Sequence, residues 1–332
     1  MNRFERQARD ALDATAVLPP LSFTWLGQTP APRALPSAPC SADRSVREAL
    51  VDALTHHLYL CFYAPGTVVL DMPRSGRAHV GRTPFVDELS RANGGRWSMQ
   101  GGWRIVERRD GCTVVSRAGL RVWASDGEIE ATTDAPPRTG AEVALRLPRE
   151  SVDALPGFYV AFGERDVTAA GPQGLVRYYW NVSSVGAVRL TALLTRALNA
   201  REIGFRLKAI SDPGAYQRAD AVVLYVSRRD RALVDSVAGD VSHALRNEMG
   251  AAVPAFTLLL APGLGFAEDP GTGESFGIHR CALLAEAIVR GAEHGLRSLE
   301  GRVALTRQVF AEAGVNLLAP YLGPPAAVGI AT

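Results

Sequence analysis

Lys208 is the side chain whose type points most directly to chemistry. It is the only lysine among the 36 Lys and Arg residues of the chain, so all the others are arginines. Arginine does not release its proton in a protein, whereas a lysine held neutral can accept one. The strand-like pattern of residues 204–210 places Arg206 on the same face, about 7 Å away. Because a neighbouring cation disfavours the ammonium form, we predict that Lys208 is a general base, although compositional drift would also leave a stray lysine.

A second group of polar side chains alternates along the segment 177–182. On a strand, Arg177, Tyr179 and Asn181 would share one face, and the apolar side chains between them would face the core. A cation, a phenol and an amide on one face suit an anionic ligand. An exposed strand face without a ligand is the alternative.

A third group follows the turn at Asp212-Pro213. Tyr216, Arg218 and Asp220 lie close in sequence to Arg206 and Lys208. Arginine binds phosphate in a bidentate manner, so a base beside forked arginines suits removal of a proton from a phosphorylated substrate. The alternative is a network of ion pairs in which the aspartates neutralise the arginines.

The segment 274–280 joins a Gly-rich stretch to a predicted helix. A helix N-terminus with Ser275, Gly277 and Arg280 favours an anion. His279 is the histidine best placed to donate a proton near neutral pH. No pair of histidines has metal-ligand spacing, and P-loop and nucleophile-elbow motifs are absent. We therefore assign no metal and no nucleotide to this segment.

The pattern of apolar residues predicts an α+β fold with a mainly antiparallel twisted sheet, flanking helices and an N-terminal β-meander. We expect helices at 1–18, 43–60, 81–95, 184–200 (with Ser184 as N-cap), 230–249, 279–297 and 301–313. We expect strands at 103–107, 112–116, 120–124, 128–132, 143–147, 158–163, 177–182, 204–210, 221–227 and 255–260. Residues 262–277 are predicted to form a long loop because they are rich in Gly and Pro.

The same pattern divides the chain into three parts. Residues 1–43 form an N-terminal helix and a Pro-rich arm. We expect the arm, residues 19–43, to pack along a surface or to order on binding. Residues 44–150 combine helices with the β-meander and are a candidate peptide-binding region. Residues 151–320 form the α+β catalytic part, which we expect to be continuous with the preceding part.

The composition narrows the class of protein. A net charge of +2 argues against general attraction to nucleic acid or membranes. The four cysteines are scattered without a C-x-x-C pair, which argues against zinc and against a disulfide framework. The first residues carry no apolar stretch of a signal peptide, so we expect a cytoplasmic protein.

Short segments spread over residues 45–300 match one known family. They are Leu58-Tyr59, Phe62-Tyr63, Leu89-Ser90, Ala92-Asn93-Gly94, Gly102-Trp103, Phe158-Tyr159, Phe162-Gly163, Arg177–Asn181, Lys208 with Asp212-Pro213, Tyr216-x-Arg218-x-Asp220, and Ser275-Phe276-Gly277 with Arg280. Each match is short, but together they resemble the HopA-type effector domain family, named after a bacterial type III effector.

The resemblance implies a function. Relatives in actinobacteria act in ribosomal-peptide biosynthesis, as the lyase partner of a small kinase in class V lanthipeptide and thioamitide pathways. The kinase phosphorylates Ser or Thr of a precursor peptide, and the lyase eliminates phosphate to give dehydroalanine or dehydrobutyrine. We therefore expect a phosphopeptide lyase without a cofactor. Its partners would be the leader and phosphorylated core of the precursor and an aminoglycoside-phosphotransferase-like kinase.

The residues fit that chemistry by analogy with lysine–histidine phosphothreonine lyases. Lys208 would remove the α-proton and His279 would protonate the departing phosphate. The expected phosphate and substrate contacts are Arg206, Arg218, Arg177, Arg280, Tyr216, Tyr179 and Asn181. Two alternatives remain: a non-catalytic subunit that binds the leader peptide and the kinase, and an effector-like interaction protein. An enzyme would gather Lys208 and the arginines, whereas a binding module would present an exposed apolar groove or sheet edge.

Overall fold

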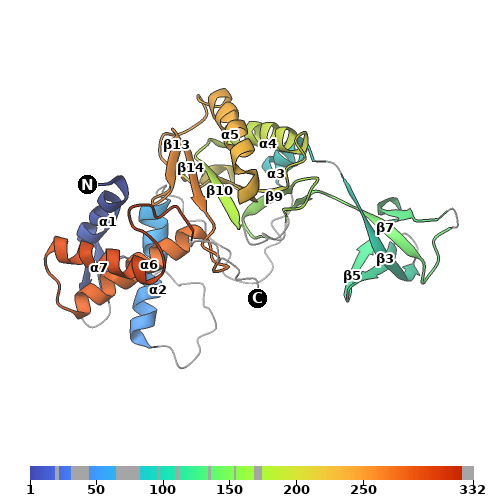
Figure 1. Cartoon of the computed structure of the whole chain (residues 1–332). Helices are drawn as coiled ribbons and strands as arrows, with labels where there is room; N and C mark the ends of the chain where they lie inside the picture. Colours follow the sequence, from blue (N-terminus) through green and yellow to red (C-terminus); the bar gives the residue numbers. More distant parts are fainter. Residues whose placement is uncertain are drawn as a thin grey trace, which may run out of the picture.

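A seven-stranded, fully antiparallel sheet forms the centre of the molecule (Figure 1). The structure is a computed structural model and describes residues 1–18, 22–30, 45–64, 83–95, 97–109, 112–133, 136–152, 155–167 and 174–323. The strands, in spatial order, are β13(Leu258–Ala261), β14(Leu264–Glu268), β10(Leu175–Trp180), β12(Val222–Ser227), β11(Phe205–Ile210), β9(Phe158–Phe162) and β8(Glu150–Ser151). The expected α+β fold with antiparallel sheets is confirmed.

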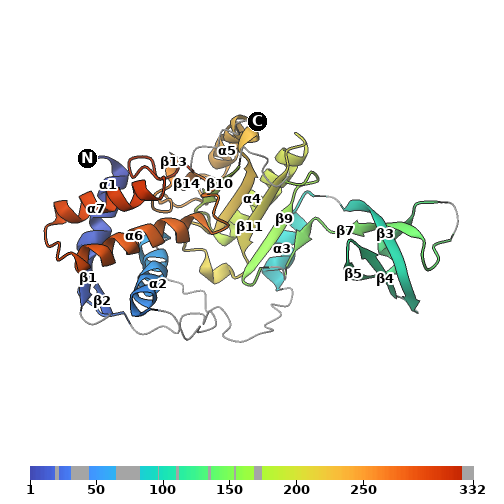
Figure 2. The ribbon, with the colours of Figure 1, turned by 60° about the horizontal axis from the view of Figure 1, so that its bottom comes forward.

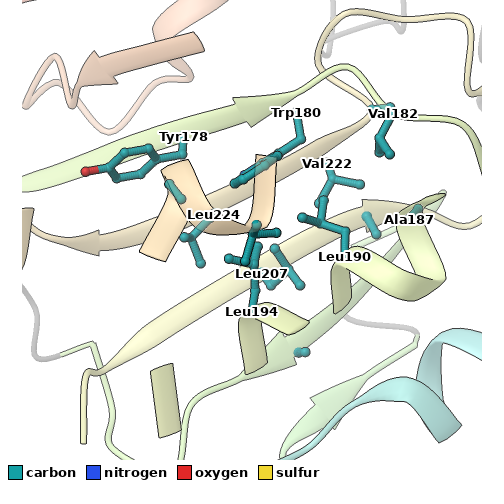
Figure 3. Close-up of a cluster of buried hydrophobic side chains, with 14 of the residues drawn as sticks. Tyr178, Trp180, Val182, Ala187, Leu190, Leu194, Leu207, Val222 and Leu224 are labelled. Carbon is teal, nitrogen blue, oxygen red and sulfur yellow. The ribbon is translucent and has the colours of Figure 1, made fainter. Parts of the chain in front are cut away.

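Three helices cover one face of this sheet: α3(Pro84–Ala92), α4(Ser184–Asn199) and α5(Arg231–Ala244). The strands β10 and β12 present every second side chain to this face, as the period of a strand requires. Trp180, Leu207 and Leu224 are fully buried there against Leu190 and Leu194 of α4 (Figure 3). This core holds the central strands rigidly, and the alternate side chains of the same strands face the other way.

The opposite face is covered by α2(Val46–Leu58) and α6(Phe276–Glu293), which Figure 2 labels, and by the π-helical turn η1(Tyr59–Tyr63). Farther out, α7(Leu299–Glu312) and the N-terminal α1(Arg3–Ala14) extend this layer. A capping box at Ser45 and Glu48 begins α2, and Ser275 caps α6. The caps fix where both helices begin, and therefore which of their side chains reach the sheet.

A second sheet of five strands forms a lobe of its own, which projects from the rest of the molecule (Figures 1 and 2). Its order is β5(Leu120–Ala124), β4(Cys112–Arg117), β3(Ser98–Arg109), β7(Glu142–Leu147) and β6(Ile129–Ala131), and the short helix η2(Asp126–Glu128) joins β5 to β6. A separate small core around Trp103, Val115 and Leu145 stabilises this lobe. β3, β4 and β5 form the expected β-meander, but β6 pairs with β7 at the other edge of the sheet and not with β5.

Several boundaries differ from the sequence-based expectations. Residues 262–277 are not one long loop, because β14 lies within them and is buried along its whole length. The sequence pattern did not predict β14 because the strand is short and contains a glycine. Gly265 packs against Thr257, a close contact that a side chain at this position would prevent. The N-cap of α4 is Ser183, not Ser184.

The N-terminal segment also differs. The expected helix 1–18 ends at Ala14, and β1(Thr15–Leu18) pairs with β2(Ser22–Trp25), a strand within the segment expected to be an arm. Phe23 of β2 is buried in the layer beside α2. The beginning of the arm therefore packs on the molecule, and residues 31–43 lie outside the described residues. None of the helices in the described ranges is long and apolar enough to cross a membrane.

Candidate functional site

The register of the large sheet brings Lys208 together with the predicted strand group. Lys208 lies opposite Val223, which lies opposite Tyr179, and Arg206 lies opposite Tyr225. Tyr225 in turn lies opposite Arg177. Residues opposite one another in an antiparallel sheet share a face. Arg177 and Tyr179 therefore lie on the same side of the sheet as Lys208 and Arg206.

Tyr225 lies between two guanidinium groups on this face. The Cζ atom of Arg206 is 4.5 Å from the centroid of the Tyr225 ring, and that of Arg177 is 5.3 Å away. Sequence reasoning missed Tyr225, because the pairing of β12 with both β10 and β11 only becomes known with the topology. The phenol of Tyr225 within the otherwise apolar run Val222–Val226 was the signal that could have singled it out.

The Lys208 amine lies in a setting that favours its neutral form. Its Nζ atom is 3.6 Å from the centroid of the Phe158 ring, a cation–π contact that by itself favours the ammonium form and is outweighed by the following influences. Burial lowers the pKa of Lys208 to about 8, and the positive charges of Arg218, Arg177 and Arg206 act in the same direction. Asp220 opposes them. Within the described residues the amine makes no hydrogen bond or ion pair, so it is available to take up a proton.

Arg218 is held by Asp220 and by a tyrosine of η1. Its Nε and Nη2 atoms donate to the two carboxylate oxygens of Asp220 at 2.8 and 3.0 Å. The Tyr59 hydroxyl donates to Asp220 at 3.2 Å and accepts from Arg218 at 3.3 Å. Both charged side chains are nearly buried, with 5% and 9% exposure. This is the ion pair considered as the alternative for Arg218, and it brings a carboxylate close to Lys208.

Arg177 is also buried and paired. It donates to Asp269, just after β14, and to the carbonyl oxygen of Glu274 at 3.2 Å. Its Nε atom is buried and has no hydrogen-bond partner in the part of the chain that the structure describes. This donor of Arg177 is enclosed, whereas Arg206 is exposed and has no acidic partner among the described residues.

The start of α6 is built differently from the expectation. Arg280 is completely buried and donates to the carbonyl oxygens of Pro320 and Leu322 at 2.8 and 2.9 Å. It also donates to Nδ1 of His279 at 2.7 Å. These contacts attach the segment after α7 to α6, and they occupy the guanidinium that was expected to bind phosphate.

His279 is a poor proton donor at neutral pH because the pKa of its imidazole is lowered. Burial, together with the positive charge of Arg280, lowers its pKa to about 4. The imidazole is therefore neutral, and its Nδ1 accepts the hydrogen bond from Arg280. Gly277, which was expected to favour an anion, allows close packing between helices. A Cβ at this position would come within 2.4 Å of the Tyr63 ring, so α6 can contact η1 only with glycine there.

The remaining predicted residues divide between the two faces. Tyr179 is on the Lys208 face, where it is buried near Tyr63, and burial raises its pKa to about 12. Tyr216 packs on Phe85 in the core of the opposite face, and its hydroxyl donates to the Ile210 carbonyl at 2.7 Å. Asn181 follows β10 and donates to the carbonyl of Ala252 at 2.9 Å. Tyr216 and Asn181 thus hold the scaffold.

The described residues contain no group of three or more His, Cys, Asp or Glu side chains that could hold a metal ion. The face around Lys208 offers cationic and phenolic groups instead: Lys208, Arg206, Arg177, Tyr225 and Tyr179. Such a set can bind an anion with its guanidinium groups and exchange protons with its amine and phenols.

Comparisons with known proteins agree with the earlier resemblance. No curated protein matches the chain. It is similar to the solved structure of an effector protein from Pseudomonas syringae pv. tomato strain DC3000, with 18% identity and a TM-score of 0.41 over 50% of this chain. The effector from Pseudomonas syringae pv. syringae strain 61 gives the same values. The chain covers 63% of the length of each of these proteins. The model of the HopA1 effector protein family matches residues 149–322, which include the whole of the large sheet, and the chain therefore belongs to this family.

Proposed function

We propose that the chain is a phosphoserine/phosphothreonine lyase, which eliminates phosphate from a kinase-modified precursor peptide to give dehydroalanine or dehydrobutyrine. One observation carries the proposal: the only lysine of the chain has a lowered pKa, makes no polar contact among the described residues, and shares a sheet face with Arg206 and Arg177. The resemblance to lyase components of class V lanthipeptide and thioamitide pathways supports the same reaction.

The chemistry requires two events at adjacent carbons. The neutral Lys208 amine takes the α-proton, and the electron pair of that C–H bond forms the Cα=Cβ double bond. The bond between Cβ and the phosphate oxygen then breaks, and its electron pair leaves with the phosphate. Arg206, which is exposed on this face, is the group that would bind the phosphate oxygens, and the buried positive charge of Arg177 would help to offset their charge.

This reaction can be tested with a synthetic phosphoserine peptide. We expect the whole chain to convert it to the dehydroalanine peptide, measured by mass spectrometry as loss of phosphoric acid. Because the base acts when neutral and its pKa is about 8, the rate should rise with pH up to and through that value. A chain that leaves the phosphopeptide unchanged at all pH values would refute the proposed function.

The five-stranded lobe favours a role in holding the peptide. Trp123 and Leu120 on the edge strand β5 are each 60% exposed, and Trp97, just before β3, is 50% exposed. A sheet edge with exposed apolar side chains is a surface to which an extended peptide can bind. We propose that the lobe contacts the leader part of the precursor, while a kinase of aminoglycoside-phosphotransferase type supplies the phosphorylated core.

Replacing Trp123 with serine separates this role from the chemistry. We expect KM for the full-length phosphorylated precursor to rise about tenfold, the cost of losing one modest aromatic contact, with a short leaderless phosphopeptide processed as before. Glu130→Gln on β6, an exposed position at the other edge of the same sheet, is the matched control. Equal effects of the Trp123 change on both substrates would contradict a leader-binding lobe.

A further inference from the structure

We propose that Tyr225 is the catalytic proton donor, whose hydroxyl protonates the phosphate oxygen as the Cβ–O bond breaks. The inference rests on the proposed lyase function and assigns the one role that the predicted residues leave unfilled, because His279 is neutral and engaged by Arg280.

The position of Tyr225 carries the argument. It lies opposite Arg206 on β11 and opposite Arg177 on β10, with both guanidinium groups over its ring. Lys208 is two residues from Arg206 along the same strand, so Tyr225 and Lys208 are diagonal neighbours on one face. Diagonal neighbours in an antiparallel sheet are about 7–8 Å apart, a separation that a substrate carbon, its neighbour and a phosphate can bridge.

The other tyrosines of this face are already occupied or enclosed. The hydroxyl of Tyr59 bonds to Asp220 and Arg218, and Tyr179 is only 4% exposed behind η1. Tyr225 is half-buried, and its hydroxyl makes no hydrogen bond among the described residues. It is therefore the phenol on this face that remains available to an incoming ligand.

The charges around Tyr225 fit a donor that must release a proton and recover it. Arg177 and Arg206 face the ring and lower the pKa of Tyr225, whereas Asp220 and Asp269 act in the opposite sense. Burial raises the pKa of Tyr225, so the group is a phenol at neutral pH and begins each cycle protonated. When the proton has left, the two guanidinium groups stabilise the phenolate.

The step balances without a further reagent. Lys208 gains the α-proton, the C–H electron pair becomes the double bond, and the Cβ–O electron pair goes to the phosphate oxygen. The O–H bond of Tyr225 breaks, and its proton joins that oxygen. Hydrogen phosphate leaves, and proton exchange with water restores the neutral amine and the phenol.

The test compares two leaving groups in the variant Tyr225→Phe, which keeps the ring between the arginines. The substrates are a phosphoserine peptide and the same peptide with S-phosphocysteine, whose elimination gives the same dehydroalanine. The leaving thiophosphate sulfur is less basic than the phosphate oxygen, so it needs a proton donor less. We expect the variant to lose about 10²-fold or more in kcat on phosphoserine and less than about tenfold on S-phosphocysteine.

The control is Tyr178→Phe, which removes a hydroxyl from the neighbouring strand β10 on the opposite face, where it bonds to Asp235. It should leave the rates on both peptides close to those of the unaltered protein, and thermal unfolding shows whether each variant is folded. An equal loss on both peptides in folded Tyr225→Phe, or no loss, would overturn the proton-donor role. If the unaltered protein eliminates from neither peptide, the lyase function itself is refuted.

Discussion

Lys208→Arg is expected to abolish elimination and to leave the protein folded. Arginine keeps the positive charge and a long aliphatic side chain, but it does not supply a neutral base. Loss of a general base costs about 10²- to 10⁴-fold in rate. Single-turnover conversion of a phosphoserine peptide, followed by mass spectrometry, measures the loss.

Two measurements separate lost chemistry from lost binding or folding. The affinity for the phosphopeptide, measured by fluorescence anisotropy, should change little, because the expected phosphate contacts Arg206 and Arg177 are intact. A second variant, Lys208→Met, removes the amine while filling the same apolar surroundings beside Phe158, and should be equally inactive. An active, folded Lys208→Arg protein would refute the assignment of the base.

Much of the site was predictable because strands impose a period of two. The strand pattern of 204–210 alone places Arg206 and Lys208 on one face, and that of 177–182 does the same for Arg177 and Tyr179. What the period cannot give is which strands are neighbours. Tyr225 joins the two groups only because β12 lies between β10 and β11, a result of tertiary pairing.

Two residues that were predicted to contact the substrate were misassigned for the same reason. Arg280 and Tyr216 were chosen for their type, and a polar type does not reveal whether a nearby carbonyl already satisfies it. Both donate to backbone carbonyls in the interior, of Pro320 and Ile210 respectively. A buried donor must find a partner, and a carbonyl from a distant segment serves as well as a ligand does. Likewise, the segment of β14 was predicted to be a loop because glycine is typical of turns. Glycine also occurs in strands where another part of the chain packs closely, so the residue type alone does not distinguish the two.

Asp220→Asn tests how the charge at Lys208 is set, and it should affect stability and pH dependence in separable ways. The carboxylate is the one group among the principal influences on Lys208 that raises its pKa, against the burial and the three arginines that lower it. With a neutral amide at this position, the pKa of Lys208 falls below about 8. Because the base is active when neutral, the rising limb of the pH–rate profile should move to lower pH.

The same change should destabilise the fold. It leaves Arg218 buried, at 5% exposure, without the carboxylate that binds it in two places. Removing one partner of a buried ion pair costs about 3 kcal/mol of unfolding free energy, which denaturant titration can measure. Asp240→Asn is the matched control, because Asp240 is exposed on α5 and has no ion pair among the described residues; it should change neither property.

The diagnostic quantity is the midpoint of the pH profile, since a loss of folded protein reduces the amplitude of the profile without moving its midpoint. A midpoint that stays in place, or that moves to higher pH, would show that Asp220 does not act on the Lys208 amine and that its contribution ends at Arg218.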